Sequence, residues 1–237
     1  MTTLERIVPD ELERDSVTGT GTYQLHLQRY EFASKFAKGP AILDIACGVG
    51  YGSCLLADRA GPTATVTSVD IDPAAIAIAN SRYRHPQVTY LTDDCTKFQK
   101  PGFFDAIVSL ETVEHLPTPG AFIQRMAENL KPGGTFVMSV PITPSVDFNP
   151  HHLQDFSERS IRKLVAANGL KAIDCLIQKQ KFNPVSVLLR REKRLEGGRK
   201  GLIGFYLRHP GKLLLRMKST VVDGFCNKYI TLACRKP

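Results

Sequence analysis

The chain alternates short apolar runs with segments in which apolar residues recur every three or four positions. Continuous apolar runs predict strands buried on both faces, whereas the longer period predicts helices that pack by one face. We therefore expect strands at 41–46, 65–70, 88–91, 104–110, 135–140, 170–177 and 229–234, and helices at 23–36, near 51–60, after Pro73, after Thr118 and at 158–168. This alternation predicts a doubly wound α/β fold, with a Rossmann-like and largely parallel sheet of about seven strands.

The turn between the first strand and its helix is the most informative segment. Residues 42–53 read Ile-Leu-Asp-Ile-Ala-Cys-Gly-Val-Gly-Tyr-Gly-Ser, so an acid within a buried run is followed by glycines at 48, 50 and 52. Glycine permits a tight turn and lets a ligand approach the backbone. The dinucleotide fingerprint would require glycine where this chain has Ser53, which argues against NAD and FAD.

The pattern D-x-x-C-G-x-G-x-G at 44–52 resembles the signature loop of class I S-adenosylmethionine (SAM) methyltransferases. The resemblance covers about 22–180 and the last strand. It implies that family's strand order, with the last strand inserted antiparallel. It also implies that Gly48 and Gly50 form a SAM-binding turn and that Asp44 orients this turn or receives the cofactor's ammonium group.

Three further residues are assigned to the cofactor by the same resemblance. Asp70 ends the second strand and would accept the two ribose hydroxyls, while Asp72 would cap the next helix. Asp94 would bind the adenine, with Asp93 as the competing choice and a plain turn carboxylate as the alternative. Arg29 on the first helix would pair with the methionine carboxylate, or would be a solvated surface arginine.

Acids and histidines follow the fourth and fifth strands. The segment 109–117 contains Glu111, Glu114 and His115, which would share one face if a helical turn starts there. A second cluster, 149–157, contains His151 and His152 on the same rim of the predicted sheet. Converging carboxylates and imidazoles are costly unless a positive group lies between them, and a divalent metal would serve.

This arrangement resembles the sites of ubiquinone-pathway O-methyltransferases, of small-RNA ribose 2′-O-methyltransferases and of bacterial sugar methyltransferases. The resemblance implies a metal held by Glu111, Glu114, His115 and His152, with His151 as an alternative. The ligands suit Mn²⁺ or Fe²⁺ as well as Mg²⁺. The competing interpretation has no metal, and His115 or His152 acts directly as the general base with Glu111 beside it.

Both interpretations favour a hydroxyl acceptor, because a sugar hydroxyl is a very weak acid and gains most from a base or metal. We expect a SAM-dependent O-methyltransferase that acts on a sugar of a glycan, lipid-linked saccharide or glycosylated metabolite. A phenolic or quinone-type acceptor is the first alternative. A non-catalytic SAM-binding docking protein is the alternative from another class.

Charge adds a local feature to this picture. The net charge of +8 comes from 190–218, which holds ten Arg or Lys residues and two Glu residues. We divide the chain into an N-terminal cap at 1–22, a methyltransferase domain at 23–180 and 229–237, and a basic, apolar insertion at 181–228. The segment 190–218 suits a lid or oligomer contact that packs Leu202, Phe205, Leu213 and Leu214 over the acceptor pocket with solvated charges, or an anionic membrane surface. With only Phe205 and Tyr206 available to stack bases, we do not expect a nucleic-acid partner.

The six cysteines are scattered without a C-x-x-C pair, which argues against a disulfide framework and a zinc site. No apolar run approaches the roughly 20 residues that a membrane span needs, and Met1 to Arg6 lack a signal-peptide core. We therefore expect a cytoplasmic protein that is peripheral to the membrane if the insertion docks there.

Overall fold

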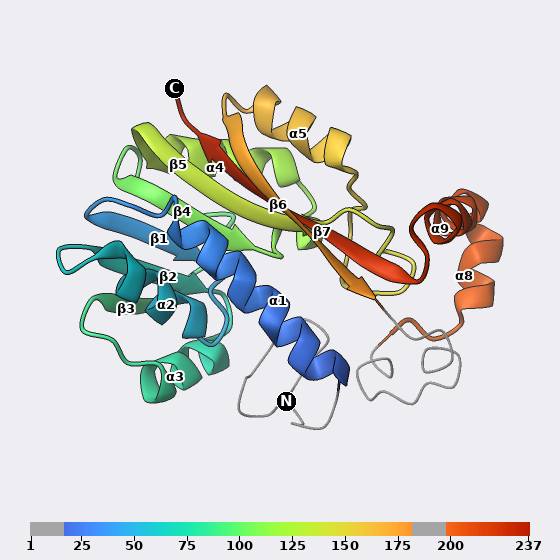
Figure 1. The fold of residues 1–237 in the computed structure, drawn as a ribbon, viewed down its shortest axis with the longest axis horizontal. Helices are drawn as coiled ribbons and strands as arrows, with labels where there is room; N and C mark the ends of the chain where they lie inside the picture. The colour runs from blue at the N-terminus through green and yellow to red at the C-terminus, as the bar shows by residue number, and fades with distance from the viewer. Residues whose placement is uncertain (1–16, 182–197) are drawn as a thin grey trace.

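A computed structural model describes residues 17–181 and 198–237, and within these ranges the chain folds around one seven-stranded sheet (Figure 1). The strand order is β3-β2-β1-β4-β5-β7-β6, and only β7 runs against its neighbours. The doubly wound fold and the antiparallel last strand are thereby confirmed. The strands are β1 (Ala41–Ile45), β2 (Thr65–Asp70), β3 (Val88–Thr92), β4 (Phe104–Leu110), β5 (Leu130–Pro141), β6 (Lys171–Lys181) and β7 (Cys226–Arg235).

Helices cover both faces of this sheet (Figure 1). One face carries α1 (Val17–Ser34), α2 (Tyr51–Ala60) and α3 (Pro73–Arg82), and the other carries α4 (Pro119–Asn129) and α5 (Glu158–Ala167). Each face has its own buried cluster, because strands in the middle of the sheet are apolar on both sides. Two further helices, α8 (Leu202–Arg208) and α9 (Pro210–Asp223), lie beyond the amino-terminal end of β7, away from both layers.

Several boundaries differ from the expected ones. The first helix begins at Val17, so part of the predicted cap is helical, while 1–16 lie outside the described residues. Strand β6 continues to Lys181 and β7 begins at Cys226 because the two pair as a long antiparallel ladder. This ladder shortens the insertion at both ends, and 182–197 lie outside the described residues.

The parallel strands end at one edge of the sheet, and the loops that follow them form the candidate site. Capping helps to place these loops. Asp72 accepts a hydrogen bond from the Ala74 N–H at the start of α3, and Ser157 forms a capping box with Ser160 at the start of α5. Among the described residues, every helix is too short or too polar to cross a bilayer. All six cysteines are free thiols.

Candidate active site

The glycine turn after β1 has one closed and one open position. Gly50 has a φ of 90°, and a Cβ on it would lie 2.7 Å from the Tyr90 hydroxyl, so packing alone demands glycine there. Gly48 also has a positive φ, of 59°, but a Cβ on it would meet no atom within 4 Å. The backbone at Gly48 therefore faces open space, as a turn that receives a ligand requires.

Asp70 lies beside this open position, at the end of the neighbouring strand β2. Its Oδ2 atom accepts the Gly48 N–H at 2.8 Å, and its Oδ1 atom accepts the Asp72 N–H at 3.0 Å. Each carboxylate oxygen can accept more than one hydrogen bond, so these contacts are compatible with hydroxyls of a ribose. Asp72 caps α3, as the sequence predicted. The ribose contact of Asp70 stays a prediction.

Asp44 is buried beneath the turn. It accepts a hydrogen bond of 2.6 Å from the Ser53 hydroxyl and one of 3.4 Å from the Tyr30 hydroxyl. Burial raises the pKa of Asp44 to about 7, although these two hydrogen bonds oppose the rise. The contacts connect β1 with α1 and α2. Of the two predicted roles, they support the orientation of the glycine turn.

Asp94 occupies a turn after β3. Its Oδ1 atom accepts both the N–H and the hydroxyl of Thr96, and Lys97 lies 3.3 Å from its Oδ2 atom. The hydrogen bonds from Thr96 hold the pKa of Asp94 below its usual range. The structure thus shows the alternative role of a turn carboxylate. The adenine contact stays a prediction for Asp94, whose neighbour Asp93 donates its N–H to the Asp70 carbonyl.

The sequence interpretation did not single out Ile71, which follows Asp70 directly. This large apolar side chain is 67% exposed, although it adjoins the end of a buried strand. An exposed apolar side chain beside the Gly48 opening offers a flat surface for an aromatic ring. The signal that could have identified Ile71 in the sequence is its position between Asp70 and Asp72, at the predicted end of the second strand.

Arg29 is not a solvated surface arginine, because its side chain is only 1% exposed. Its Nε donates to the Gln178 Oε1 atom at 2.8 Å, and its guanidinium stacks 4.2 Å from the centre of the Tyr229 ring. Its Nη1 atom lies 3.3 Å from the Glu111 Oε1 atom, as an ion pair without the alignment of a hydrogen bond. Arg29 therefore connects α1 with β6, β7 and the end of β4.

Glu111 is turned away from the histidines. Its φ of 51° is unusual for a side chain of this size, and its N–H bonds to both oxygen atoms of Ser139. The Ser139 hydroxyl in turn donates to Glu111 Oε1 at 2.7 Å. The helical turn spans only Val113–His115, so the predicted shared face of Glu111, Glu114 and His115 is wrong.

The structure does bring Glu114, His115 and His152 together. One ligand atom from each of these side chains lies within 4.8 Å of the other two. The two imidazole rings are 4.6 Å apart, centre to centre, and almost perpendicular. Both carboxylate oxygens of Glu114 are buried. A carboxylate with two imidazoles is a donor set that fits a divalent transition metal such as Mn²⁺.

Hydrogen bonds from the loop around 143–157 orient the rings. The Nδ1 atom of His115 lies 3.2 Å from the His151 carbonyl oxygen, to which it can only donate, so the lone pair of a neutral ring is on Nε2. His152 Nδ1 bonds to the Ser145 hydroxyl at 2.7 Å. Burial and the nearby His115 ring lower the pKa of His152 to about 3, which keeps this ring neutral. His152, rather than the exposed His151, belongs to the cluster.

The same loop is held in place from two sides. The Glu114 carbonyl accepts the N–H groups of Leu153 and Gln154, which fixes the loop to the turn after β4. From the insertion, Arg216 bonds Asp147 with two nitrogens, and Lys212 bonds Asp155 at 2.6 Å. The lid interpretation expected solvated charges, whereas Lys212 and Arg216 are partly buried and paired with carboxylates. It also expected Leu214 to pack over a pocket, and this side chain is exposed.

Comparison with known proteins shows what this chain is similar to. Residues 42–134 match the family model of a methyltransferase domain. A probable S-adenosylmethionine-dependent methyltransferase of Mycolicibacterium smegmatis is 28% identical over 65% of this chain and 61% of its own length. A ubiquinone biosynthesis O-methyltransferase of Xanthomonas campestris pv. campestris is 38% identical over 43% of each chain. The chain therefore covers less than two thirds of the length of either relative.

Solved structures share the fold at low sequence identity. A putative methyltransferase from Bacillus halodurans superposes with a TM-score of 0.67 at 18% identity, covering 89% of this chain and 98% of that one. The [4+2]-cyclase SpnF has a TM-score of 0.63 at 18% identity, covering 96% and 86%. The fold alone therefore does not define the reaction. What the comparisons show is a methyltransferase domain at 42–134 and a similarity of this chain to SAM-dependent methyltransferases.

Proposed function

We propose that the protein is a SAM-dependent O-methyltransferase whose acceptor hydroxyl is deprotonated at the cluster of Glu114, His115 and His152. The observation that carries this proposal is the imidazole pair of His115 and His152, next to a buried carboxylate, at the edge where β4 and β5 end. The glycine turn and Asp70 lie at the ends of β1 and β2, and β1 pairs with β4. The proposed cofactor and acceptor sites would thus lie side by side.

The residues present fit the cofactor. The open backbone at Gly48 and the adjoining Asp70 carboxylate would hold its ribose, and exposed Ile71 would cover one face of its base. Gly50 shapes the turn, and Asp44 orients it. Bound SAM supplies a methyl group already activated by a sulfonium. The protein's own tasks are to align the acceptor and to take its proton.

His115 is positioned for the proton transfer. Its Nδ1 faces a carbonyl, which directs the basic lone pair of Nε2 to the other side of the ring. An imidazole is a suitable base near neutral pH, and positioned bases contribute typically about 10²–10⁴-fold to rate. Glu114 would stabilise the imidazolium that forms. Glu111 and Arg29 form an internal pair behind the cluster, so Arg29 would reach a cofactor carboxylate only by leaving that pair.

The cluster also suits a divalent metal, which would be held by Glu114, His115 and His152. Such an ion would lower the pKa of an acceptor hydroxyl. Two imidazoles favour Mn²⁺ over Mg²⁺. Glu111 faces Ser139 and would join the ligands only after turning away from it.

A sugar hydroxyl remains our proposed acceptor, because a hydroxyl of such high pKa gains most from a nearby base or metal. A phenolic acceptor is the second candidate. The specific observation in its favour is the 38% identity to a ubiquinone biosynthesis O-methyltransferase over 105 residues, which is the highest identity among the relatives compared.

The test is transfer of labelled methyl groups from SAM to a panel of saccharides and a matched panel of catechols and phenols. We expect O-methylated product. Activity that is reduced by EDTA and restored by Mn²⁺, with calorimetric Mn²⁺ binding that is lost in His152→Ala, would make His115 a metal ligand and not the base. Full activity in EDTA would exclude the metal and support His115 as the base. Intact SAM binding with no product from either panel would favour the non-catalytic docking protein.

A further inference from the structure

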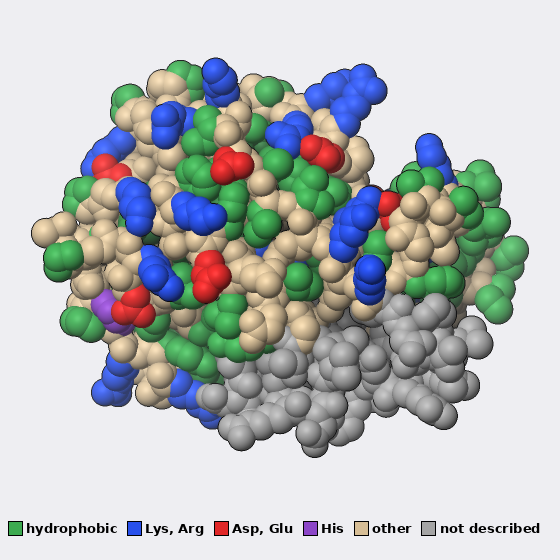
Figure 2. Space-filling model, viewed as in Figure 1, with side chains coloured by type: hydrophobic (Ala, Val, Ile, Leu, Met, Phe, Trp, Pro, Cys, Tyr) green, Lys and Arg blue, Asp and Glu red, His purple; other side chains and the backbone are tan. Residues whose placement is uncertain are grey.

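The helices α8 and α9 expose a continuous set of large apolar side chains. On α8, Ile203 and Leu207 are four residues apart and about 80% exposed. On α9, Val221 and Val222 are 85% and 70% exposed, and the same stripe includes Leu214 and Met217. Figure 2 shows hydrophobic side chains gathered over this end of the molecule. We call Ile203, Leu207, Leu214, Met217, Val221 and Val222 the apolar surface.

The charges around the apolar surface are mostly positive. No Asp or Glu occurs between Gly198 and Val222, and the adjacent Asp223 is paired with Lys228. Lys212 and Arg216 bind Asp155 and Asp147, which leaves Lys200, Arg208 and Lys218 exposed at its margin. An apolar centre with a mainly cationic margin is complementary to an anionic lipid surface.

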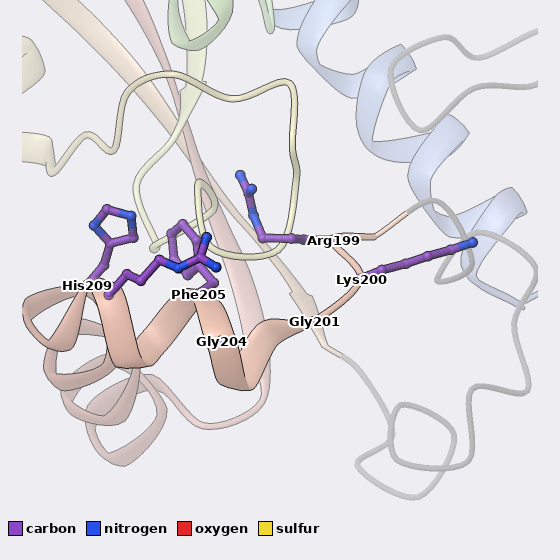
Figure 3. A pocket seen from close by; sticks show the side chains of 7 residues that line it. Arg199, Lys200, Gly201, Gly204, Phe205 and His209 are labelled. Carbon is purple, nitrogen blue, oxygen red and sulfur yellow. The ribbon is translucent and has the colours of Figure 1, made fainter.

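A basic depression of about 470 Å³ adjoins the apolar surface (Figure 3). Its lining residues are Arg199, Lys200, Gly201, Gly204, Phe205, Arg208 and His209. Arg199 is already engaged, since it donates to the Val146 carbonyl and lies over the Phe205 ring at 4.5 Å. Lys200 projects away from it in Figure 3. Among the described residues, the depression is therefore left with the exposed Arg208 as its free cation above a glycine floor, and it is large enough to admit a phosphate group.

We propose that α8 and α9 form a membrane-docking element that inserts the apolar surface into an anionic phospholipid bilayer interface, with lipid phosphates in the basic depression. RNA fits less well, because Phe205 is covered by Arg199 and the Tyr206 hydroxyl is bonded to Asp147. A symmetric contact with a second copy would bring the cationic margin against itself. The docking does not depend on methyl transfer.

Docking would place the membrane beside the candidate site. Arg216 and Lys212 on α9 hold Asp147 and Asp155, and these acids belong to the loop that carries His152. A membrane-bound α9 would therefore fix the orientation of this loop relative to the bilayer. An acceptor carried on a lipid would reach the cluster without leaving the membrane.

The experiment is vesicle flotation of the full chain. We expect it to float with vesicles of phosphatidylcholine containing about one third phosphatidylglycerol and to remain behind with phosphatidylcholine alone. Association should weaken as salt rises, because the screening length shrinks to about 10 Å at 0.1 M. Equal binding to both vesicle types, or to neither at low salt, overturns the proposal.

Two variants locate the contact. Ile203→Ser with Leu207→Ser, Val221→Ser and Val222→Ser should reduce association at least tenfold, whereas Phe103→Ser with Ile173→Ser, exposed on the body, should not. Lys200→Gln with Arg208→Gln and Lys218→Gln should also reduce it at least tenfold.

The matched charge control is Lys163→Gln with Lys171→Gln and Lys179→Gln, which removes the same charge from exposed body positions. An equal loss in this control would mean that vesicle binding depends on net charge alone, and would contradict a defined docking element.

Sedimentation of both apolar variants tests the other possible occupant of the apolar surface, which is a second copy of the chain. A dimer that becomes monomeric in the α8–α9 variant, with no vesicle binding by the parent, would assign the apolar surface to a second copy. Inorganic phosphate that displaces the protein at millimolar concentration would assign the depression to a free anion.

Discussion

The two halves of the carboxyl edge are built in different ways. Around β1, β2 and β3, the polar contacts join residues that are close or moderately close in sequence: Asp70 and Asp72 are 2 residues apart, Gly48 and Asp70 are 22 apart, and Gly50 and Tyr90 are 40 apart. Around β4, β5 and β7, they also join distant segments. Arg29 and Gln178 are 149 residues apart, and Asp147 and Arg216 are 69 apart. The cofactor half is therefore built from nearer segments of the chain than the acceptor half.

Because the two halves are built differently, the binding of cofactor and the binding of acceptor can be altered independently. A turn and a strand end can bind the same cofactor whatever the rest of the chain does. The acceptor half depends on the insertion, because α9 holds the loop that carries His152. Substitutions in the two halves should therefore have separable effects on SAM affinity, turnover and stability.

The largest difference between the effect on turnover and the effect on SAM affinity is expected at His115. His115→Ala should lower kcat by about 10²–10⁴-fold through loss of the base, while SAM affinity measured by calorimetry stays within about twofold. His151→Ala is the matched control, because this neighbour is exposed and contributes its backbone carbonyl to the cluster. Equal losses in both variants would show that the loop, not the imidazole, matters.

Asp70 should show the opposite pattern. If Asp70 binds the ribose as proposed, Asp70→Ala would remove two charge-assisted hydrogen bonds worth about 1.5–3 kcal/mol each, so SAM affinity should fall by roughly 100-fold or more. Asp72→Ala removes only the cap of α3 and should cost about 1 kcal/mol of unfolding free energy with little change in affinity. Unchanged SAM affinity in Asp70→Ala would remove the strand end from the cofactor site.

Asp44 tests the cofactor half by pH. Its pKa is raised to about 7, so the folded state holds a proton that the unfolded chain releases near pH 4. Its contribution to stability therefore falls as pH rises from about 4 to 7. Between pH 5 and 8 the wild type should lose roughly 2–3 kcal/mol of unfolding free energy relative to Asp44→Asn. Parallel pH profiles in denaturant titrations would contradict a buried, proton-binding Asp44.

The smallest effect tests the connection to the insertion. Arg216→Met leaves the buried Asp147 carboxylate with Tyr206 and a backbone N–H, which should cost about 2 kcal/mol of unfolding free energy and raise the acceptor KM. SAM affinity should not change. Lys218→Met on the same helix is the control, with an expected change within about 0.5 kcal/mol. A matching loss of SAM affinity would show that the halves are not separable.

The sequence predicted what is encoded locally. The strand series, the glycine turn and the cap at Asp72 follow from short patterns, and each is present in the structure. The boundaries of β6 and β7 were missed, because pairing between these strands extends both beyond their apolar centres.

For the site, the sequence correctly placed the acids and histidines at the carboxyl edge of the sheet, but it did not predict which of these side chains contact one another. Helical spacing placed Glu111 with His115, whereas the left-handed backbone at Glu111 turns its carboxylate to Ser139 and Arg29. The cations of α9 were expected to be solvated or lipid-bound. Their partners Asp147 and Asp155 lie more than fifty residues away, and no periodicity encodes such a pair.

The position of β7 has a consequence for the order of assembly. Strand β6 reaches the sheet only through β7, which lies between it and β5. During synthesis β6 and the insertion would emerge before the strand that attaches them, while β1 to β5 already have their partners. The nascent chain would thus fold its cofactor half first, and α9 would pack against the loop that contains Asp147 last. Variants that slow this late step should accumulate a partly folded intermediate whose glycine turn is already formed.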